Sequence, residues 1–343
     1  VDIDGAATTD GITNAGNFST DGGTIKLDGN YPTGTGNVAL GDAALGAITN
    51  GERNVAIGTN TMDANTTGDR NTAVGYAAMS EYNVTDGGND YNVAVGYAAL
   101  NGTTTGAYNT AVGGDALQAN TTADNNTAVG YDALRSNTTG AENTATGYRA
   151  LKSNTTAPNN TAFGRTALED NTTGANNTAV GFQTMQLNTT GTQNTATGYR
   201  ALDANTTGSN NVAMGQNALG ANTTASNNTA VGKDAMILNT TGHSNTALGY
   251  TALYNNTTGT SNVAVGWAAA DANTTGGAIT AIGEHALGAN TTASNNTACG
   301  REALKNNTAG SQTAVGASAL KSNTSGATNT CLLYTSPSPR DNL

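Results

Sequence analysis

The sequence predicts an all-β protein, a parallel β-solenoid (β-roll) of about seventeen coils with 17 residues in each coil. Three observations support this fold class: a 17-residue unit fills most of the chain, two small residues recur in every copy, and β-branched residues surround them. The unit reads NTAVGYDALRSNTTGAE from Asn126 and begins again as NTATGYRALKSNTTAPN from Asn143. One copy has too few apolar side chains to close a core, so copies must stack on one another.

The repeats run continuously through residues 37–330. Seventeen copies begin at Asn37, Asn54, Asn71, Asn92, Asn109, Asn126, Asn143, Asn160, Asn177, Asn194, Asn211, Asn228, Asn245, Asn262, Ile279, Asn296 and Gln312, and a further copy begins at Asn329. The copy from Asn71 has four extra residues and the copy from Asn296 lacks one. Both changes fall in the NTTG half of the unit, so we expect that half to form an outward loop.

The third position of the unit is Ala and the fifth is Gly in all seventeen copies, as at Ala128 and Gly130. Gly suits a backbone bend with positive φ, or an approach too close for a Cβ atom. Ala suits an interior point where a larger side chain would overpack. Because the second and fourth positions are mostly Thr, Val, Leu or Ile, positions two to four should form a short strand. Alternation then points the Ala inward and its neighbours outward, where a second copy of the chain could cover them.

The eighth and ninth positions are mostly Ala-Leu, as at Ala133 and Leu134. They predict a second internal row, and we expect a second strand there because a helix of this length would not nucleate. The fifteenth position is usually Gly but is Ala at Ala123 and Ala157, so positive φ is not expected at that corner. At about 4.8 Å per coil the repeats would build a rod of roughly 80 Å, with ladders of stacked Asn and Thr side chains.

Two flanking segments lack the repeat. Residues 1–36 combine short β-prone pieces with Gly and Asp-Gly turns, and we interpret them as an N-terminal β segment or cap. The tail from Cys331, CLLYTSPSPRDNL, resembles a translated transposase sequencing adapter over its first eleven residues. We therefore interpret residues 331–343 as read-through at the end of a metagenomic contig and not as native protein. The alternative is a natural tail rich in Pro and Ser.

Composition narrows the function classes. The chain carries a formal charge of −11 and only 11% charged residues, so nucleic acid is not an expected partner. No apolar run reaches the length of a membrane span, and no signal peptide is visible. The two cysteines, Cys299 and Cys331, are too few for a disulfide framework. Cys299 occupies the fourth position of its copy and is expected to be a small packed side chain.

The pattern N-[TV]-A-[VI]-G-x-x-A-L across residues 37–330 is similar to the head repeats of YadA-like trimeric autotransporter adhesins. With its NTTG extension it also resembles repeat regions of phage tail-fibre proteins. The resemblance implies a left-handed parallel β-roll in a homotrimer, located on a virion or at a cell surface. This unit is longer than the usual adhesin head repeat, and the sequence shows no membrane anchor, stalk heptads or chaperone domain.

Candidate sites are few. Aromatic residues recur at the sixth position and form a possible surface contact stripe: Tyr76, Tyr97, Tyr131, Tyr148, Phe182, Tyr199, Tyr250 and Trp267. The alternative for these rings is simple stacking between coils. His243 and His285 occupy unrelated positions and are interpreted as solvated loop residues. The Gly/Asp-rich insertion at 86–90 is interpreted as a plain loop, with calcium binding as the alternative.

Tripeptides that begin at Asn137 and Asn125 match the N-glycosylation sequon, but turn and ladder chemistry explains their recurrence first. We expect no catalytic residues, no cofactor and no metal, and hence no enzyme. The sequence favours a structural or adhesive fibre segment whose partners are its own copies and possible host-surface glycans or receptors. The alternatives are an ice-binding solenoid, which Thr ladders would suggest, and a calcium-stabilised secreted solenoid.

Overall fold

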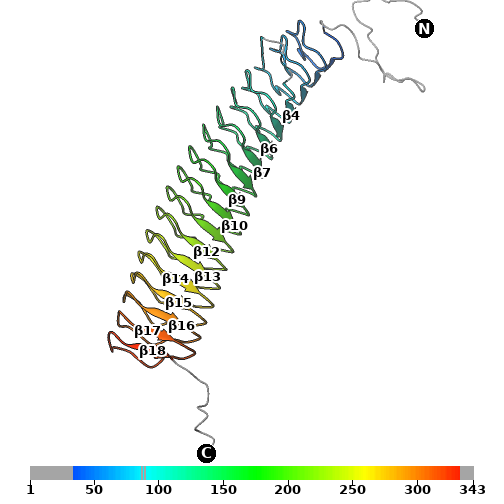
Figure 1. Ribbon diagram of the computed structural model, residues 1–343. Helices are drawn as coiled ribbons and strands as arrows, with labels where there is room; N and C mark the ends of the chain where they lie inside the picture. The colour runs from blue at the N-terminus through cyan, green and yellow to red at the C-terminus, as the bar shows by residue number, and fades with distance from the viewer. Residues whose placement is uncertain (1–33, 86–87, 89, 333–343) are drawn as a thin grey trace, which may run out of the picture.

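The computed structural model describes residues 34–85, 88 and 90–332. Their chain winds into a gently curved rod of stacked coils, with one short strand in each coil (Figure 1). The all-β solenoid prediction is confirmed for this part of the chain, which contains no α-helix. The expectations for residues 1–33, for the centre of the insertion and for residues 333–343 lie outside the described residues.

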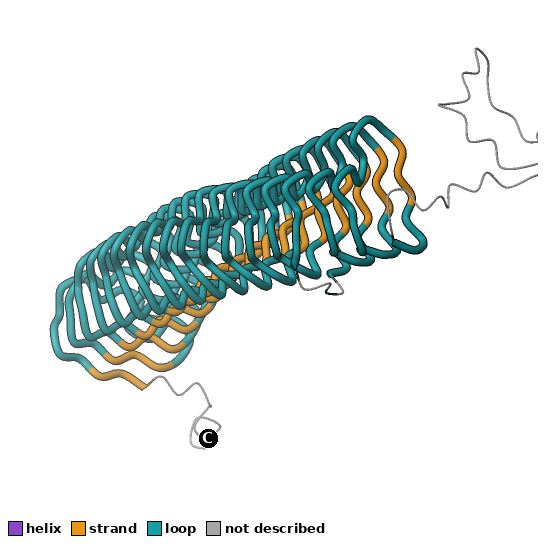
Figure 2. Tube along the Cα trace, turned by 90° about the horizontal axis from the view of Figure 1, so that it is seen from above, coloured by secondary structure: helices purple, strands orange, loops and turns teal. Residues whose placement is uncertain are grey.

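Eighteen strands of three residues each form one parallel sheet along the rod (Figure 2). They are β1 Val38–Leu40, β2 Val55–Ile57, β3 Thr72–Val74, β4 Val93–Val95, β5 Thr110–Val112, β6 Thr127–Val129, β7 Thr144–Thr146, β8 Thr161–Phe163, β9 Thr178–Val180, β10 Thr195–Thr197, β11 Val212–Met214, β12 Thr229–Val231, β13 Thr246–Leu248, β14 Val263–Val265, β15 Thr280–Ile282, β16 Thr297–Cys299, β17 Thr313–Val315 and β18 Thr330–Leu332. Each strand occupies the second to fourth positions of its repeat, as the sequence predicts.

Consecutive strands pair in register, so that Ala128 of β6 lies beside Ala111 of β5 and Ala145 of β7. The register holds across both irregular copies: Thr72 pairs with Val93, and Thr297 pairs with Thr313. The length changes are therefore absorbed in the NTTG half, as expected. Strand β18 continues the ladder just beyond the predicted solenoid boundary at residue 330, where Cys331 pairs with Ala314.

The Ala of the third position is fully buried in every coil from Ala56 to Ala314. It packs against the second internal row, in which Ala133 and Leu134 are likewise 0% exposed. The core is therefore a thin column of Ala and Leu that runs the length of the rod. Such a column cannot be widened at one level without displacing the coils above and below.

The Gly of the fifth position adopts φ between 123° and 140° in all seventeen copies. A Cβ atom on Gly130 would also lie 2.5 Å from the carbonyl oxygen of Gly147 in the next coil. Both reasons that the sequence suggests for this Gly therefore apply. The fifteenth position behaves differently, because Gly140 has no positive φ and Ala replaces it in other copies.

The predicted second strand is wrong, because the segment of the second internal row is a turn in every coil. In the copy from Asn126 the seventh and ninth residues, Asp132 and Leu134, have left-handed φ values of 58° and 51°. Alternation of this kind breaks the extended backbone that a strand needs. Hydrogen bonds still run along the axis, since the Leu134 amide donates to the Ala150 carbonyl at 3.0 Å.

Candidate functional site

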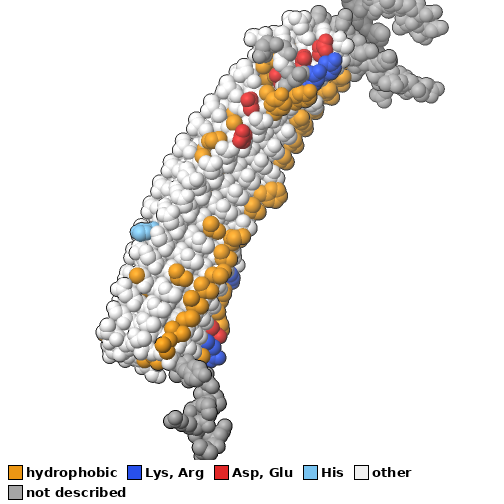
Figure 3. Space-filling view, in the orientation of Figure 1, with side chains coloured by type: hydrophobic (Ala, Val, Ile, Leu, Met, Phe, Trp, Pro, Cys, Tyr) orange, Lys and Arg blue, Asp and Glu red, His pale blue; other side chains and the backbone are white. Residues whose placement is uncertain are grey.

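The outer surface of the sheet is the candidate site. We call the outward side chains of the second and fourth positions in β1–β17 the strand face. Its fourth-position residues are half-buried, as Val180 is, or exposed, up to 58% at Phe163. No charged residue occupies either position in any of the seventeen copies, although the chain carries a net charge of −11. The strand face is thus an uncharged band along the rod, with Thr or Val at the second position and mostly aliphatic residues at the fourth, part of which is visible as the orange edge in Figure 3.

The described residues leave this band uncovered. The described coils contact their neighbours along the axis, and the pairing of each strand is complete through β18. Large apolar stripes on soluble proteins usually mark a contact with another molecule. The sequence predicts that the Ala side is buried and the Thr/Val side needs a second layer; the burial of the Ala side is confirmed.

Aromatic residues at the sixth position lie directly beside the strand face and stack along the axis. Tyr76 and Tyr97 have ring centroids 5.6 Å apart, and Phe182 and Tyr199 are equally close. Tyr131 and Tyr148 stack at 5.9 Å. The inter-coil stacking that the sequence suggests as one role for these rings is present in these pairs.

The longest stack joins five coils around Arg165. Its guanidinium group lies 5.6 Å from the Tyr148 ring centroid and 5.5 Å from that of Phe182. With Tyr131 beyond Tyr148 and Tyr199 beyond Phe182, both faces of the two inner rings are covered. The stack therefore presents ring edges, hydroxyl groups and the guanidinium N–H groups outward. Stacking of a sugar ring onto an aromatic face would be limited to the ends of such stacks.

Tyr250 and Trp267 do not belong to a long stack. Lys233 lies 6.0 Å from the Tyr250 ring centroid, and Trp267 meets His285 at 5.0 Å with a tilt of 49°. The eight aromatic residues of the predicted contact stripe are thus brought into one row by the fold, but as several separate groups. Their contact with another molecule stays a prediction.

The opposite corner of each coil is built on a ladder of buried Asn side chains at the twelfth position. The Asn137 amide donates to the Asn120 side-chain oxygen at 3.1 Å and to the Gly140 carbonyl at 2.9 Å. Side-chain bonds of 2.7–3.1 Å continue this ladder from Asn120 to Asn290. It stops where one residue is missing near Gly310, and the Asn290 side-chain oxygen has no partner. The predicted Asn ladder is confirmed.

Burial separates the two kinds of sequon. Asn137 is 0% exposed and its amide hydrogens are engaged, so the folded rod closes the Asn-Thr-Thr acceptors to a glycosyltransferase. Asn125 is exposed, and its left-handed φ of 59° is one that Asn tolerates well. Thr138 also serves the ladder, because its hydroxyl donates to the Thr155 carbonyl at 3.0 Å. Thr139 faces solvent.

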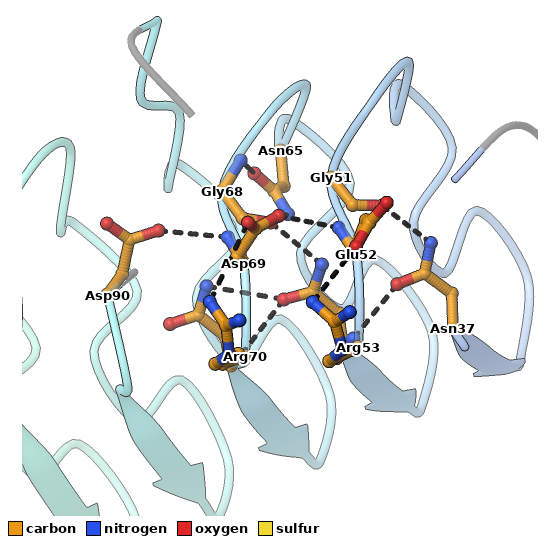
Figure 4. Close-up of polar contacts among 11 residues, drawn as sticks. Asn37, Gly51, Glu52, Arg53, Asn65, Gly68, Asp69, Arg70 and Asp90 are labelled. Atoms are coloured by element: carbon orange, nitrogen blue, oxygen red, sulfur yellow. Dashed lines mark hydrogen bonds and ion pairs between the residues drawn. The ribbon is translucent and has the colours of Figure 1, made fainter. Parts of the chain in front are cut away.

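In the N-terminal coils, carboxylates at the sixteenth position add hydrogen bonds between coils beside this ladder (Figure 4). An Asp69 carboxylate oxygen accepts a hydrogen bond from the Glu52 amide at 2.6 Å, and Asp90 accepts one from the Asp69 amide at 3.0 Å. Burial raises the pKa of Asp90, and the nearby Asp69 charge adds to the rise. Tyr82 fills the space of the missing ladder Asn and is fully buried.

Other titratable groups form local pairs. Hydrogen bonds from Lys305 and Lys321 lower the pKa of Glu302 to about 2. Within residues 34–332, apart from the undescribed positions, no three His, Cys, Asp or Glu side chains are grouped as a metal site would require. His243 is exposed, with Ser244 at 3.3 Å. Cys299 is half-buried and points outward on the strand face.

Two shallow hollows interrupt the surface. One, of about 300 Å³, lies where Gly220 and Ala221 leave a gap between Asp203 and Leu238. The other, of about 260 Å³, lies beside the insertion and includes Asp90. Neither hollow is lined by a nucleophile beside a base or by several donors that point to one spot, which are the features that identify a candidate catalytic centre.

Comparisons with known proteins give no identification: no family of known proteins matches the chain, and no curated protein sequence does. The described residues also contain no helix with the length and hydrophobicity needed to cross a bilayer. The geometry of the rod itself therefore has to support any functional conclusion.

Proposed function

We propose that the chain is a structural and adhesive fibre segment in which three copies form a left-handed homotrimeric β-roll. Its place would be a phage tail fibre on the virion or an adhesin on the extracellular surface of a cell. One observation carries the proposal, namely that the described residues leave the uncharged strand face, with its aliphatic and Thr side chains, uncovered along the rod. The number of copies and the left-handed winding in this proposal are taken from the resemblance of the repeats to adhesin heads and tail fibres.

The area of the strand face suits a stable contact between copies. Seventeen coils at about 4.8 Å give a length of roughly 80 Å, and three to four residues across give a width of about 10 Å. The face thus offers about 800 Å² per copy, which is the amount that a standard protein–protein interface takes from each partner. Because the face carries no charge, copies can approach it without bringing like charges together.

The fibre role explains why the chain is poor in reactive groups. A rod of this kind holds a binding end away from a surface, and its demands are length, rigidity and resistance to unfolding. A host-surface glycan or receptor would then contact the rod at its polar edge, where the sixth-position tyrosines lie, or at another part of the fibre. No step of catalysis is assigned to the chain.

The mass of the assembly in solution tests the proposal. Light scattering on the full chain should give three times the monomer mass of 34.0 kDa. A variant with Val112→Lys and Val129→Lys places two charges on the strand face and should reduce the trimer to monomers. Thr122→Lys with Thr139→Lys adds the same charges to the Asn-Thr-Thr corner of the same coils and should leave it intact. A monomeric parent chain would refute the proposal.

Ice binding has less support. The Thr138 hydroxyl is engaged by the next coil, so only a single file of threonines such as Thr139 faces water at that corner. The rod is also curved (Figure 1), whereas an ice plane is flat. Thermal hysteresis would detect such an activity. Melting on addition of a chelator would likewise reveal a calcium-stabilised solenoid.

A further inference from the structure

A contact between copies that repeats every coil raises the question of register. The second to fourth positions are nearly the same in every copy, so sliding one rod past another by one coil would lose only a small part of the contact. Uniform strands specify register weakly. One register can be selected only by residues that interrupt the repeat. A charged side chain that has no oppositely charged partner in its own chain is such a residue.

Arg165 is such a residue. Among the described arginines, the other six each lie within 4.0 Å of a carboxylate of this chain: Arg53, Arg70, Arg135, Arg149, Arg200 and Arg301. Arg165 takes part in no ion pair within the described residues and is exposed. Because Tyr148 and Phe182 cover its two faces, only its N–H edge is free. That edge is a rigid donor fork suited to a carboxylate.

Glu142 has the complementary property on the other side of the sheet. It occupies the seventeenth position, two residues before β7, whereas Arg165 occupies the sixth, two residues after β8. Glu142 is exposed, and no ion pair within the described residues involves it. It lies 23 residues before Arg165, which is about 1.4 coils, or roughly 6–7 Å along the axis. Extended Arg and Glu side chains can bridge such an offset.

In a cyclic assembly, each copy contacts the next through two different surfaces. Around a threefold axis, the side of the sheet that carries the sixth position faces the side of the next copy that carries the seventeenth position. We propose that Arg165 of one copy binds Glu142 of the adjacent copy and so sets the axial register of the fibre. This inference rests on the proposed function, since it requires that copies associate through the strand face.

The surroundings of Arg165 favour a second copy as its partner. Phe163, in the same coil, has the largest exposure among the large hydrophobic residues of the strand face in β1–β17, at 58%. One neighbouring copy would cover that ring and neutralise Arg165 together, and a central aromatic residue with an adjacent Arg is typical of interface hot spots. Lys233, also at the sixth position, has no such match, because only neutral residues, Asn210, Asn227 and Ser244, lie near its level in the seventeenth-position row.

Charge reversal tests the pairing on the full chain. Arg165→Glu and Glu142→Arg should each raise the dissociation constant of the assembly about tenfold, and more steeply at low salt. The double variant should return it to within about threefold of the parent chain. Lys233→Glu is the matched control, because it reverses a charge in the same row that has no proposed partner. This variant should change the dissociation constant less than twofold. Circular dichroism confirms that each variant keeps its fold.

The outcomes separate the two proposals. A parent chain that stays monomeric at all concentrations overturns both, and leaves Arg165 to an anionic partner of another kind. An assembled parent whose stability is unchanged by Arg165→Glu, or whose single effects simply add in the double variant, overturns the register pair alone. If dilution cannot dissociate the assembly, the rate of subunit exchange between tagged and untagged chains gives the same comparison.

Discussion

The two corners of each coil use the same residue types in different ways. The strand corner, positions one to five, contains a buried Asn, the invariant Ala and a Gly with φ near 135°, as at Gly130. The Asn-Thr-Thr corner, positions twelve to seventeen, also contains a buried Asn and usually a Gly, as at Gly140, but without positive φ. The first corner keeps its length, its Ala and its Gly in all seventeen copies, whereas the second accepts Ala, an insertion and a deletion.

The difference shows where a stacked fold is rigid. At the strand corner the backbone of one coil lies against the backbone of the next, so any added atom meets a carbonyl group that cannot move alone. At the other corner a carbonyl group is equally close, 2.5 Å from a Cβ atom placed on Gly140, but the backbone there has no positive φ and Asn and Thr side chains supply much of the contact. Side-chain contacts can be remade around a longer loop, and the copy from Asn71 does so while its strand register stays unchanged.

Matched glycine substitutions should give the largest contrast. Gly130→Ala introduces a strained φ and a Cβ atom 2.5 Å from the Gly147 carbonyl, and should lower the free energy of unfolding by about 3 kcal/mol or more. Gly140→Ala also meets a close carbonyl, but its φ is permitted and Ala123 shows that the corner adjusts, so about 1 kcal/mol or less is expected. Urea unfolding of the two variants measures both. Equal losses would contradict the contrast between the corners.

Removing one buried Asn from each corner should give the next largest effect. Asn137→Ala leaves the Asn120 side-chain oxygen and the Gly140 carbonyl without their donor, at a cost of about 2–3 kcal/mol. Asn143→Ala removes a donor to the Ala157 carbonyl and an acceptor for the Asn160 amide, with about 2 kcal/mol expected.

Hydrogen exchange would localise these two losses, because each should increase exchange in the coils directly above and below the substitution. Ser136→Ala, one residue before the ladder and half-exposed, is the control and should change little. An Asn137→Ala chain as stable as the parent would show that the ladder is not a source of stability.

A smaller effect is expected at Asp90, in the corner with the insertion. Burial raises the pKa of this carboxyl group in the folded state, so the ionised form is penalised in the fold at neutral pH. The penalty is present above the folded pKa and is relieved as pH falls toward the unfolded value near 3.9. Asp90→Asn should therefore increase stability slightly at pH 7, by less than about 1 kcal/mol, and the gain should disappear below about pH 4. Melting temperatures across this range measure it; a gain independent of pH would contradict the explanation.

Much of the fold could be predicted because the repeats provide an internal comparison. Seventeen aligned copies show that Ala128 and Gly130 tolerate no substitute and that Gly140 does, which is information that a single unrepeated strand would not carry. The strand, its register, the buried Ala row and the loop corner all follow from that comparison. The candidate face follows as well, since alternation alone places Thr127 and Val129 outside.

The second strand could not be predicted correctly from the same pattern. Ala133 and Leu134 indicate burial, but two buried neighbours in sequence do not alternate between faces as a strand requires. The left-handed φ at Asp132 and Leu134 is not evident from residue choice, because the seventh position accepts many residue types and the ninth is Leu, Met or Ala, as burial alone would require. Such conformations persist because hydrogen bonds to both neighbouring coils hold each peptide in place.

The sequence by itself determined the coil: its length, its strand, its inward Ala and outward Thr or Val, and the side on which it accepts insertions. These features depend on residues within one repeat, and comparison of the repeats shows which of those residues cannot change. Only the tertiary structure decided how the rows meet. It showed that Arg165 is held between Tyr148 and Phe182 without an ion pair among the described residues, and that the Asn side chains of the Asn-Thr-Thr tripeptides are buried. Those contacts join different coils, and they depend on which side chains the stacking of the coils places next to one another.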